Sequence, residues 1–218
     1  MRIKQLLSIF LIGFSISISA QDYLALGDSY TIGESVLESE RWPNQLAQEL
    51  EGTSLGVDTV TIIAKTGWTT AELIEGIRIS KNTNQYDLVS LLIGVNNQYR
   101  GQSIERFEKE LVALIQTAIE YSKTGSKAVF LVSIPDWGVT PFAKDRNRTQ
   151  IAKEIDAFNA VISKQAKNFK LPFIDITPIS KGASSDLSLL AEDQLHPSGK
   201  MYNLWVQKIK SELLKTKR

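Results

Sequence analysis

The sequence predicts an α/β fold in which a mainly parallel β-sheet is covered by helices on both faces, giving three layers. Short apolar stretches, each ended by glycine, proline or polar residues, are typical of buried strands. Segments with apolar residues at helical spacing lie between them and are typical of amphipathic helices. Strands that alternate with helices are joined by crossover connections, which place about five strands parallel. The 218 residues are enough for one domain, which we expect to span 21–218.

The first half of the chain contains three of the expected strands, at residues 23–26, 57–64 and 88–93. A helix is expected from Trp42, because Pro43 suits the first turn of a helix. Thr69 is followed three residues later by Glu72, a capping box that predicts a second helix. Residues 95–98 are polar and are expected to form a loop.

The second half contains the remaining strands, expected at residues 127–134 and 171–176. Amphipathic patterns predict three further helices, one after Ser103, one over 151–169 and one after Pro197. Two longer loops are expected at 136–148 and 180–194, the second with a helical turn at 187–190.

The composition excludes several classes of protein. Hydrophobic residues make up 43% and charged residues 22% of the chain, which is ordinary for a globular protein. The formal net charge is +1 and no basic stripe is present, so nothing indicates a nucleic-acid partner. The chain has no cysteine, which excludes disulfides, a thiol nucleophile and thiolate metal sites.

The first twenty residues have the pattern of a secretory signal peptide. Arg2 and Lys4 precede an apolar run over 6–18, and the small residue Ala20 stands at the expected cleavage point. The run is short for a transmembrane helix, so no stable membrane anchor is expected after cleavage. We therefore expect residues 1–20 to be removed and the protein to be exported, to the periplasm or outside a bacterial cell.

Polar residues and glycines follow the first three predicted strands. Ser29 follows the first strand, Gly67 the second and Asn96 the third, while Asp193 and His196 precede the last helix. The carboxyl ends of parallel strands lie at one edge of a sheet, which is where ligands bind in such folds. We expect these five residues to gather there. Each residue type is also common in ordinary turns, so only the combination points to chemistry.

The five residues supply the groups needed for acyl transfer. Ser29 is a nucleophile once a base removes its proton, and His196, the only histidine in the chain, is the natural base near neutral pH. Asp193 lies three residues earlier and can orient the imidazole. The backbone N–H groups of Ser29 and Gly67 and the amide of Asn96 are candidate oxyanion donors. A histidine base must be uncharged, so activity should fall below about pH 6 to 7.

Residues 52–56, with the sequence GTSLG, match the G-x-S-x-G pattern around another class of nucleophilic serine. That pattern requires a strand before it and a helix after it. Here a predicted helix precedes the segment and a strand follows, so we interpret Ser54 as a turn residue.

The chain resembles the GDSL or SGNH hydrolase family in four blocks that occur in the family's order. They are GDSY at 27–30, Gly67, GVNN at 94–97 and DQLHP at 193–197. The resemblance implies a flavodoxin-like α/β/α fold, with Ser29 as nucleophile, His196 as base and Asp193 as its orienting acid. It also implies an oxyanion hole formed by Ser29, Gly67 and Asn96, and no metal or organic cofactor. Asn97 stands where the family often has aspartate, a departure that concerns how the loop is held.

The function implied by the resemblance is ester hydrolysis through an acyl-enzyme on a small-molecule, carbohydrate or lipid ester, with a short-chain or acetyl ester as the first guess. The two long loops are expected to shape the pocket, and four aromatic residues could wall it: Trp68, Tyr99, Trp137 and Phe142. An inactive glycan- or cell-wall-binding domain on the same fold is the alternative. A flavin or nucleotide protein is disfavoured, since no P-loop lysine or G-x-G-x-x-G is present. The sequence gives no indication of the oligomeric state.

Overall fold

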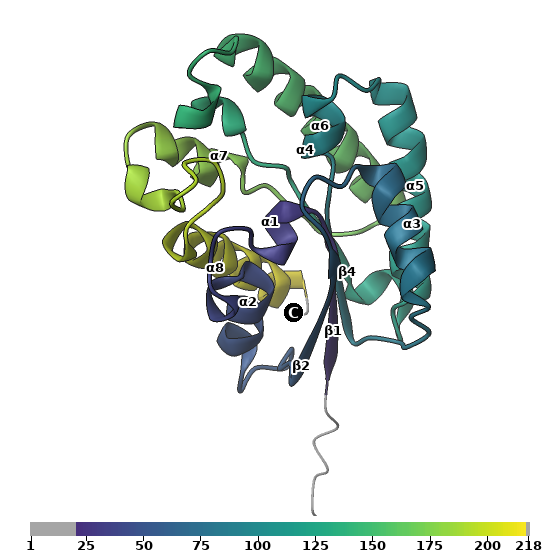
Figure 1. Ribbon diagram of the computed structural model, residues 1–218. Coiled ribbons are helices and arrows are strands. Elements are labelled where there is room, and N and C mark those ends of the chain that lie inside the picture. Colours follow the sequence, from purple (N-terminus) through teal and green to yellow (C-terminus); the bar gives the residue numbers. More distant parts are fainter. Residues whose placement is uncertain (1–20, 217–218) are drawn as a thin grey trace, which may run out of the picture.

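The computed structural model describes residues 21–216, so the predicted signal peptide lies outside the described residues. The described chain contains a parallel sheet of five strands in the order β2-β1-β3-β4-β5 (Figure 1). The strands are β1 (Asp22–Gly27), β2 (Thr59–Ala64), β3 (Leu88–Leu92), β4 (Val129–Val132) and β5 (Phe173–Ile174). This is the strand order of flavodoxin-like folds, and it confirms the predicted α/β class.

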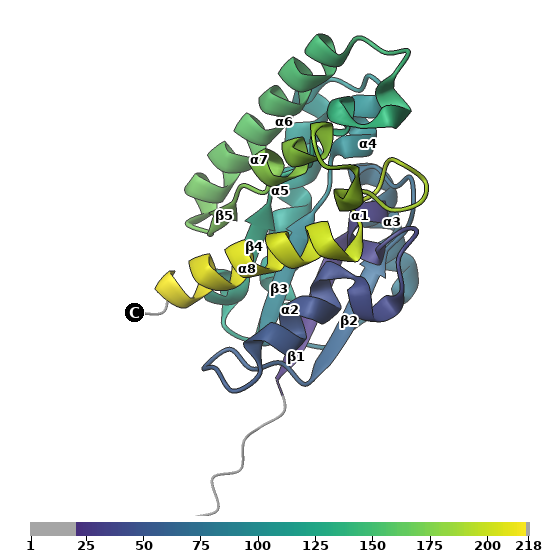
Figure 2. The same ribbon diagram turned by 90° about the vertical axis from the view of Figure 1, so that its left-hand side faces the viewer.

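Long helices cover both faces of the sheet, as Figures 1 and 2 show from two directions. On one face, α2 (Trp42–Leu50) packs beside α8 (Gly199–Thr216). On the other face lie α3 (Thr70–Ser80), α5 (Ile104–Glu120) and α6 (Arg148–Phe169). The crossover after β1 therefore uses one face, the next three crossovers use the other, and α8 returns to the first. The result is the expected three-layer arrangement.

Short helical segments connect these elements within residues 21–216. Three are single α-helical turns: α1 (Ser29–Ile32), α4 (Val95–Tyr99) and α7 (Thr177–Ser180). Six are 3₁₀ turns: η1 (Glu38–Glu40), η2 (Gly125–Ala128), η3 (Trp137–Val139), η4 (Pro141–Ala143), η5 (Lys181–Ser184) and η6 (Leu187–Leu189). The last of these confirms the helical turn predicted in the 180–194 loop.

The structure corrects the expected loop at residues 95–98, which form most of helix α4 instead. The segment lacks an apolar face at helical spacing, because two of its buried residues, Asn97 and Gln98, are polar. Both make side-chain hydrogen bonds to neighbouring elements, which takes the place of apolar burial. The 136–148 loop likewise contains η3 and η4, and β5 is shorter than the strand predicted over 171–176.

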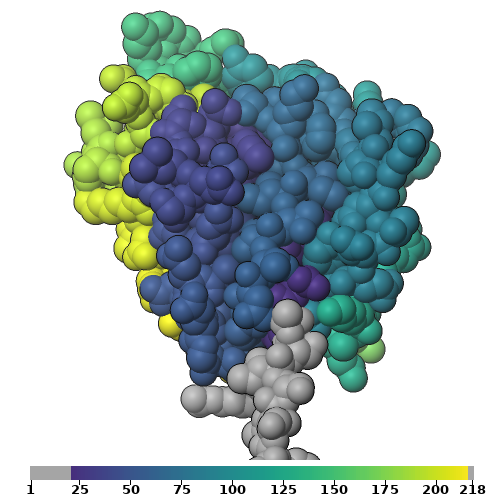
Figure 3. Space-filling model, turned by 60° about the horizontal axis from the view of Figure 1, so that its bottom comes forward, coloured from purple at the N-terminus to yellow at the C-terminus, as the bar shows by residue number. Residues whose placement is uncertain are grey.

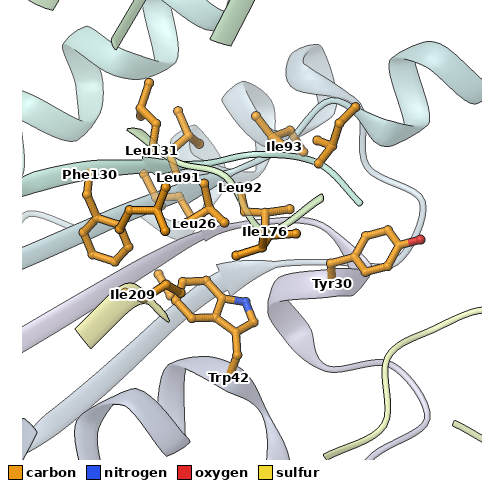
Figure 4. Packing of buried hydrophobic residues seen from close by; sticks show 14 of the residues in the cluster. Leu26, Tyr30, Trp42, Leu91, Leu92, Ile93, Phe130, Leu131, Ile176 and Ile209 are labelled. Carbon is orange, nitrogen blue, oxygen red and sulfur yellow. The ribbon is translucent and has the colours of Figure 1, made fainter. Parts of the chain in front are cut away.

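The core between α2 and the sheet is built on aromatic rings. Trp42, at the start of α2, is fully buried, with its ring 6.4 Å from that of Tyr23 and 6.5 Å from that of Phe130. Figure 4 shows Trp42 facing the strands, near Ile209 of α8. Burial of each large apolar side chain contributes about 1.5 to 3 kcal/mol, so these contacts hold α2 and α8 firmly on one face.

The two ends of the sheet differ. Figure 3 brings forward the end at which β1 begins, and shows the blue residues of the α2 region beside the yellow α8. At the opposite end, α1 follows β1 and α4 follows β3. The chain changes direction across the sheet between β1 and β3, so this is the switch point at which open α/β folds bind ligands. No helix within residues 21–216 is long and apolar enough to cross a membrane.

Candidate active site

The turn after β1 places Ser29 at the carboxyl end of the sheet. Gly27 ends the strand, and a Cβ at this position would overlap the Thr31 hydroxyl and the Leu92 carbonyl oxygen. Only glycine allows β1 and β3 to approach the turn this closely. Ser29 is the first residue of α1 and only 5% exposed, so its position is fixed by the packed strand ends.

Asp28 holds the start of α1. Its Oδ1 accepts a hydrogen bond from the Tyr30 backbone N–H at 3.0 Å, as an N-cap residue does. The side chain is fully buried, and Oδ2 has no hydrogen-bond partner in the described part of the chain. Burial raises the pKa of Asp28 to about 7, and the hydrogen bond from Tyr30 only partly opposes this shift.

Asp193 and His196 form a close pair before α8. Asp193 Oδ2 lies 2.6 Å from His196 Nδ1, and Oδ1 accepts the backbone N–H groups of Leu195 and His196, each at 2.9 Å. Oδ2 also accepts a hydrogen bond from the Ser35 hydroxyl at 2.7 Å. Burial raises the pKa of Asp193, but the hydrogen bonds from His196, Ser35 and the backbone outweigh it and lower the pKa to about 2. The carboxylate is therefore charged near neutral pH.

The imidazole of His196 is held between this carboxylate and an aromatic ring. The residue is 8% exposed, and its ring centroid lies 5.3 Å from that of Tyr30. Tyr30 in turn packs 6.4 Å from the Trp205 ring of α8. With Nδ1 facing Asp193, Nε2 is the ring nitrogen left to exchange a proton with a neighbouring hydroxyl.

The turn after β2 is held by an ion pair. Gly67 has a φ of 84°, the left-handed conformation that favours glycine, in a turn closed by a Trp68 N–H to Lys65 carbonyl hydrogen bond of 3.2 Å. The Arg100 guanidinium donates to the Gly67 carbonyl at 2.5 Å and to Glu72 at 3.1 Å. The carbonyl side of Gly67 is thus fixed, and the residue faces the cavity described below.

Helix α4 positions Asn96 after β3. Its start is Gly94, whose φ is 129° and where a Cβ would come within 2.7 Å of the Phe107 ring. Asn96 Nδ2 donates a 3.0 Å hydrogen bond to the Trp68 carbonyl. An amide nitrogen carries two hydrogens, so this bond orients the group and leaves one N–H for another acceptor.

Asn97 ties α4 to α3. Its Oδ1 accepts the Thr70 backbone N–H at 3.1 Å, and its Nδ2 donates to the Thr70 hydroxyl at 2.7 Å and to Gln102 at 2.9 Å. The Thr70 hydroxyl donates in turn to Glu110 of α5. A fully buried amide therefore uses both its donor and its acceptor, which an aspartate at this position would not do.

One cavity of about 200 Å³ opens at this end of the sheet. Its lining combines a few polar groups with an apolar, largely aromatic wall: Ser29, Tyr30, Thr66, Gly67, Val95, Asn96, Tyr99, Trp137, Phe142, Leu195 and His196. Within residues 21–216 no group of three or more His, Asp or Glu side chains is arranged to hold a metal ion.

Three aromatic rings form one side of the cavity. The Tyr99 and Trp137 rings lie 5.3 Å apart, and that of Phe142 lies 6.0 Å from Trp137. Trp137 is nearly buried, whereas Tyr99 and Phe142 are each 47% exposed and form the mouth. The Arg146 guanidinium lies 5.9 Å from the centre of the Tyr99 ring, a cation–π contact at the edge of this wall.

Trp137 is fixed by a hydrogen-bond chain that reaches α6. Its Nε1 donates to Gln98 Oε1 at 2.8 Å, and Gln98 Nε2 donates to Glu154 Oε2 at 2.6 Å. The other oxygen of Glu154 accepts from Gln150 at 2.7 Å. The charged acceptor fixes which way the Gln98 amide points, so the Gln98 carbonyl oxygen faces the indole.

The structure brings together most of the site residues expected from the sequence. Ser29, Gly67, Asn96 and His196 line the cavity together with Tyr99, Trp137 and Phe142, while Asp193 lies behind His196.

Trp68 is placed elsewhere. It is not among the lining residues, and its ring packs on Gly76 of α3, where a Cβ would overlap it. Sequence reasoning missed the lining residues Tyr30, Thr66, Val95 and Leu195, although each lies next to a predicted site residue.

The sequence from residue 25 to residue 204 matches the GDSL-like Lipase/Acylhydrolase family. The chain belongs to this family. The matched region contains the strand ends, the Ser29 turn and the Asp193–His196 pair, and it confirms the resemblance seen in the sequence blocks. A search of curated proteins found no match.

Solved structures show that the GDSL-like chain shares its fold with several esterases. An acetyl xylan esterase from Geobacillus stearothermophilus has 18% identity and a TM-score of 0.67, with 88% of this chain and 94% of that chain covered. Phospholipase A1 from Streptomyces albidoflavus NA297 has 19% identity and a TM-score of 0.67, covering 89% and 100%. The esterase EstA from Pseudoalteromonas sp. has 16% identity and a TM-score of 0.66, covering 89% and 97%. At these identities the likeness establishes the fold.

Proposed function

We propose that this GDSL-family chain is a carboxylic ester hydrolase that works through an acyl-enzyme on Ser29. Ser29 and His196 line one cavity, and Asp193 Oδ2 lies 2.6 Å from Nδ1 of the His196 imidazole. The presence of Ser29 and His196 in one cavity, with Asp193 against the imidazole, is the observation that carries the proposal, and it supports the roles of nucleophile, base and orienting acid. A serine-to-alanine variant of the Geobacillus acetyl xylan esterase is described as a catalytic mutant, which supports a serine nucleophile in this fold.

The reaction has two steps. Ser29 Oγ attacks the ester carbonyl carbon while His196 Nε2 takes the hydroxyl proton. The bond from the carbonyl carbon to the alcohol oxygen breaks, and the imidazolium returns the proton to the departing alcohol. Water then attacks the acyl-enzyme, gives a proton to His196, and releases the acid as Ser29 recovers its hydrogen. Asp193 stays charged throughout and stabilises the imidazolium.

The tetrahedral intermediates carry a negative oxygen that needs fixed donors. We assign the Ser29 and Gly67 backbone N–H groups and the Asn96 side-chain amide to this role. Each comes from a different strand end, and each is held by a contact outside the cavity: α1 for Ser29, Arg100 for Gly67 and the Trp68 carbonyl for Asn96. Preorganised donors of this kind need no rearrangement during the reaction.

The substrate we propose is a short-chain or acetyl ester borne by a carbohydrate or lipid. Tyr99, Trp137 and Phe142 offer apolar faces next to the nucleophile, and aromatic faces of this kind commonly line small-molecule sites. The cavity is small, about 200 Å³, which suits a compact acyl group. The fold neighbours include an enzyme described as acting on acetyl xylan and one described as a phospholipase, which supports both kinds of alcohol part.

Two further proposals concern the whole chain. We propose that residues 21–218 form one catalytic domain, since the sheet and the cavity draw on elements from β1 to α8. We also propose that residues 1–20 direct export, on the strength of their basic start, apolar run and small residue at position 20.

The test is hydrolysis of p-nitrophenyl esters from acetate to longer chains by wild type and by Ser29→Ala. We expect the variant to lose on the order of 10⁴- to 10⁶-fold in kcat. A fluorophosphonate probe should label wild type at Ser29 and leave the variant unlabelled. Ser54→Ala, a change of an exposed serine in the turn after α2, is the control and should label normally. Wild type that neither turns over esters nor accepts the probe would favour a glycan-binding domain instead.

A further inference from the structure

Ser35 contacts the predicted catalytic acid from a distant part of the chain. Its hydroxyl donates a 2.7 Å hydrogen bond to Asp193 Oδ2, and the two residues are 158 positions apart. The same oxygen lies 2.6 Å from His196 Nδ1. One carboxylate oxygen is therefore shared between the imidazole and the Ser35 hydroxyl.

The backbone at Ser35 adopts an uncommon conformation. Its φ is 64°, in the left-handed region where a residue with a Cβ is disfavoured, and only three other non-glycine residues within 21–216 share it. The same loop is anchored on both sides of Ser35. The Glu34 side chain accepts a hydrogen bond from Thr66, and Val36 packs against the core. The loop is thus fixed where its serine meets Asp193.

We propose that Ser35 is a positioning residue that holds the Asp193 carboxylate in the rotation at which Oδ2 faces His196. The inference rests on the proposed function, since it concerns the acid of that triad. The N–H groups of Leu195 and His196 hold only Oδ1. Ser35 supplies a contact to Oδ2 that comes from outside the turn that carries Asp193.

The direction of the hydrogen bond gives it a second consequence. An ionised carboxylate only accepts hydrogen bonds, so the Ser35 hydroxyl donates. The donated proton offsets part of the negative charge on Oδ2, the oxygen that attracts the imidazolium. Ser35 is exposed, so water replaces the lost donor in part when the hydroxyl is removed. The kinetic effect should therefore be moderate rather than total.

Other charged or titratable groups face the pair and remain unchanged in the variants. The Tyr30 ring lies against His196, and the charges of Asp28, Asp193 and Asp136 act on its phenol. On α8, the Tyr202 phenol is subject to the charges of Asp28, Asp193 and Glu34. A change in the pH profile of a Ser35 variant therefore reports the loss of this one donor.

The test uses two substitutions that remove the hydroxyl and differ in their backbone freedom. Ser35→Ala keeps the disfavoured φ, whereas Ser35→Gly relieves it. Both should lower kcat/KM for p-nitrophenyl acetate by about 10-fold, mainly through kcat, because a misplaced orienting group impairs the chemical step. In both, the acid-side midpoint of the pH profile should move up by about half a unit, since the uncompensated carboxylate attracts the imidazolium more strongly.

Ser39→Ala, a loss of a serine hydroxyl on the neighbouring exposed turn η1, is the matched control and should match wild type. A double variant should show coupling: on an Asp193→Asn background, Ser35→Ala should cost less than 3-fold, or about a third of its effect in wild type. If Ser35→Gly keeps the wild-type rate and pH profile while Ser29→Ala is inactive, the positioning role is refuted and the proposed function stands. If wild type itself shows no Ser29-dependent turnover, both fail together.

Discussion

The indole nitrogen of Trp137 donates a 2.8 Å hydrogen bond to the side-chain oxygen of Gln98. Gln98 lies on α4, two residues after the proposed oxyanion donor Asn96, and is anchored by Glu154 of α6. The aromatic wall and the proposed oxyanion donor Asn96 are therefore connected through helix α4. A change in the aromatic wall should therefore mainly affect the binding and orientation of the substrate.

We predict that Gln98→Met raises KM for p-nitrophenyl butyrate by roughly 10-fold with a smaller change in kcat. Methionine has similar length but only a weakly accepting sulfur and no donor, so Trp137 loses its strong hydrogen bond and Glu154 loses a donor. Stability should fall by about 1 to 3 kcal/mol, the usual cost of leaving buried polar groups unpaired.

Gln150→Met is the control for Gln98, because Gln150 bonds the other oxygen of Glu154 from an exposed position. It should leave KM unchanged. An unchanged KM in Gln98→Met, measured over the whole ester series, would show that the hydrogen bond does not position the wall.

The fold and the triad candidates could be predicted because they depend on local patterns. Apolar runs ended by glycine or proline identify strands, and parallel strands bring their carboxyl ends together whatever their spacing in the chain. Ser29, Gly67 and Asn96 follow three of these strands in the sequence. Asp193 and His196, which precede the last helix, are predicted from their chemistry and from the resemblance to the family.

The supporting contacts could not be predicted, because they depend on which polar groups meet in space. The sequence predicts a loop at 95–98, where the structure has helix α4, because Asn97 and Gln98 are buried by hydrogen bonds rather than on an apolar face. Ser35 contacts Asp193 although the two residues are 158 positions apart, and no sequence motif around Ser35 predicts this contact. Trp68 was expected in the cavity, but Gly76 leaves room for its ring on α3.

We predict that Asp28 makes stability fall as pH rises, and that Asp28→Asn removes this dependence. The folded-state pKa of about 7 lies above the 3.8 that is usual for an aspartate, so the folded state holds the proton more tightly. The contribution of Asp28 to stability is therefore complete below about pH 4 and is lost as the pH rises to about 7. Over this range the buried carboxyl group ionises, and its Oδ2 has no hydrogen-bond partner within residues 21–216. Asparagine keeps an oxygen for the Tyr30 N–H and carries no charge.

The measurement for Asp28 is urea unfolding of wild type and Asp28→Asn at about pH 4 and about pH 8. The two proteins should be similar at the lower pH, and the variant should be more stable by a few kcal/mol at the higher pH. Asp145→Asn, a charge loss on an exposed loop, serves as the control. Parallel stability curves for wild type and Asp28→Asn would contradict the prediction.

We predict that Asn97→Asp destabilises the protein, although aspartate is common at this point in the family's sequence block. The buried amide donates to Thr70 and Gln102, and a carboxylate cannot donate to either. The new charge would also lie near Glu110, which accepts from the same Thr70 hydroxyl. Stability at neutral pH should fall by about 2 to 4 kcal/mol.

The loss in Asn97→Asp should shrink as the pH is lowered, because protonation restores a donor and removes the charge. Thermal unfolding at about pH 5 and about pH 8 measures it. Asn84→Asp, on an exposed segment, controls for the added charge and should change stability by less than about 0.5 kcal/mol. A variant as stable as wild type at both pH values would mean that Gln102 and Thr70 find other partners at no cost.

Alanine substitution at two glycines with similar backbone conformations distinguishes an effect on stability from an effect on catalysis. Gly67 has a φ of 84° and Gly52 a φ of 70°, and an added Cβ meets no close contact at either position. Gly67 lines the cavity, whereas Gly52 lies in the turn after α2. Alanine at either position should cost about 1 kcal/mol of stability, the usual penalty for a Cβ in the left-handed region.

Only Gly67→Ala should also lose activity. If the Gly67 N–H is an oxyanion donor, a methyl group beside it and a small shift of the turn should lower kcat by about 10²-fold. Comparing the two variants cancels the stability penalty that they share, because the added Cβ is disfavoured to a similar extent by the positive φ of each turn. Equal kcat values in Gly67→Ala and Gly52→Ala, at equal losses of stability, would remove Gly67 from the oxyanion hole and leave Ser29 and Asn96 as its donors.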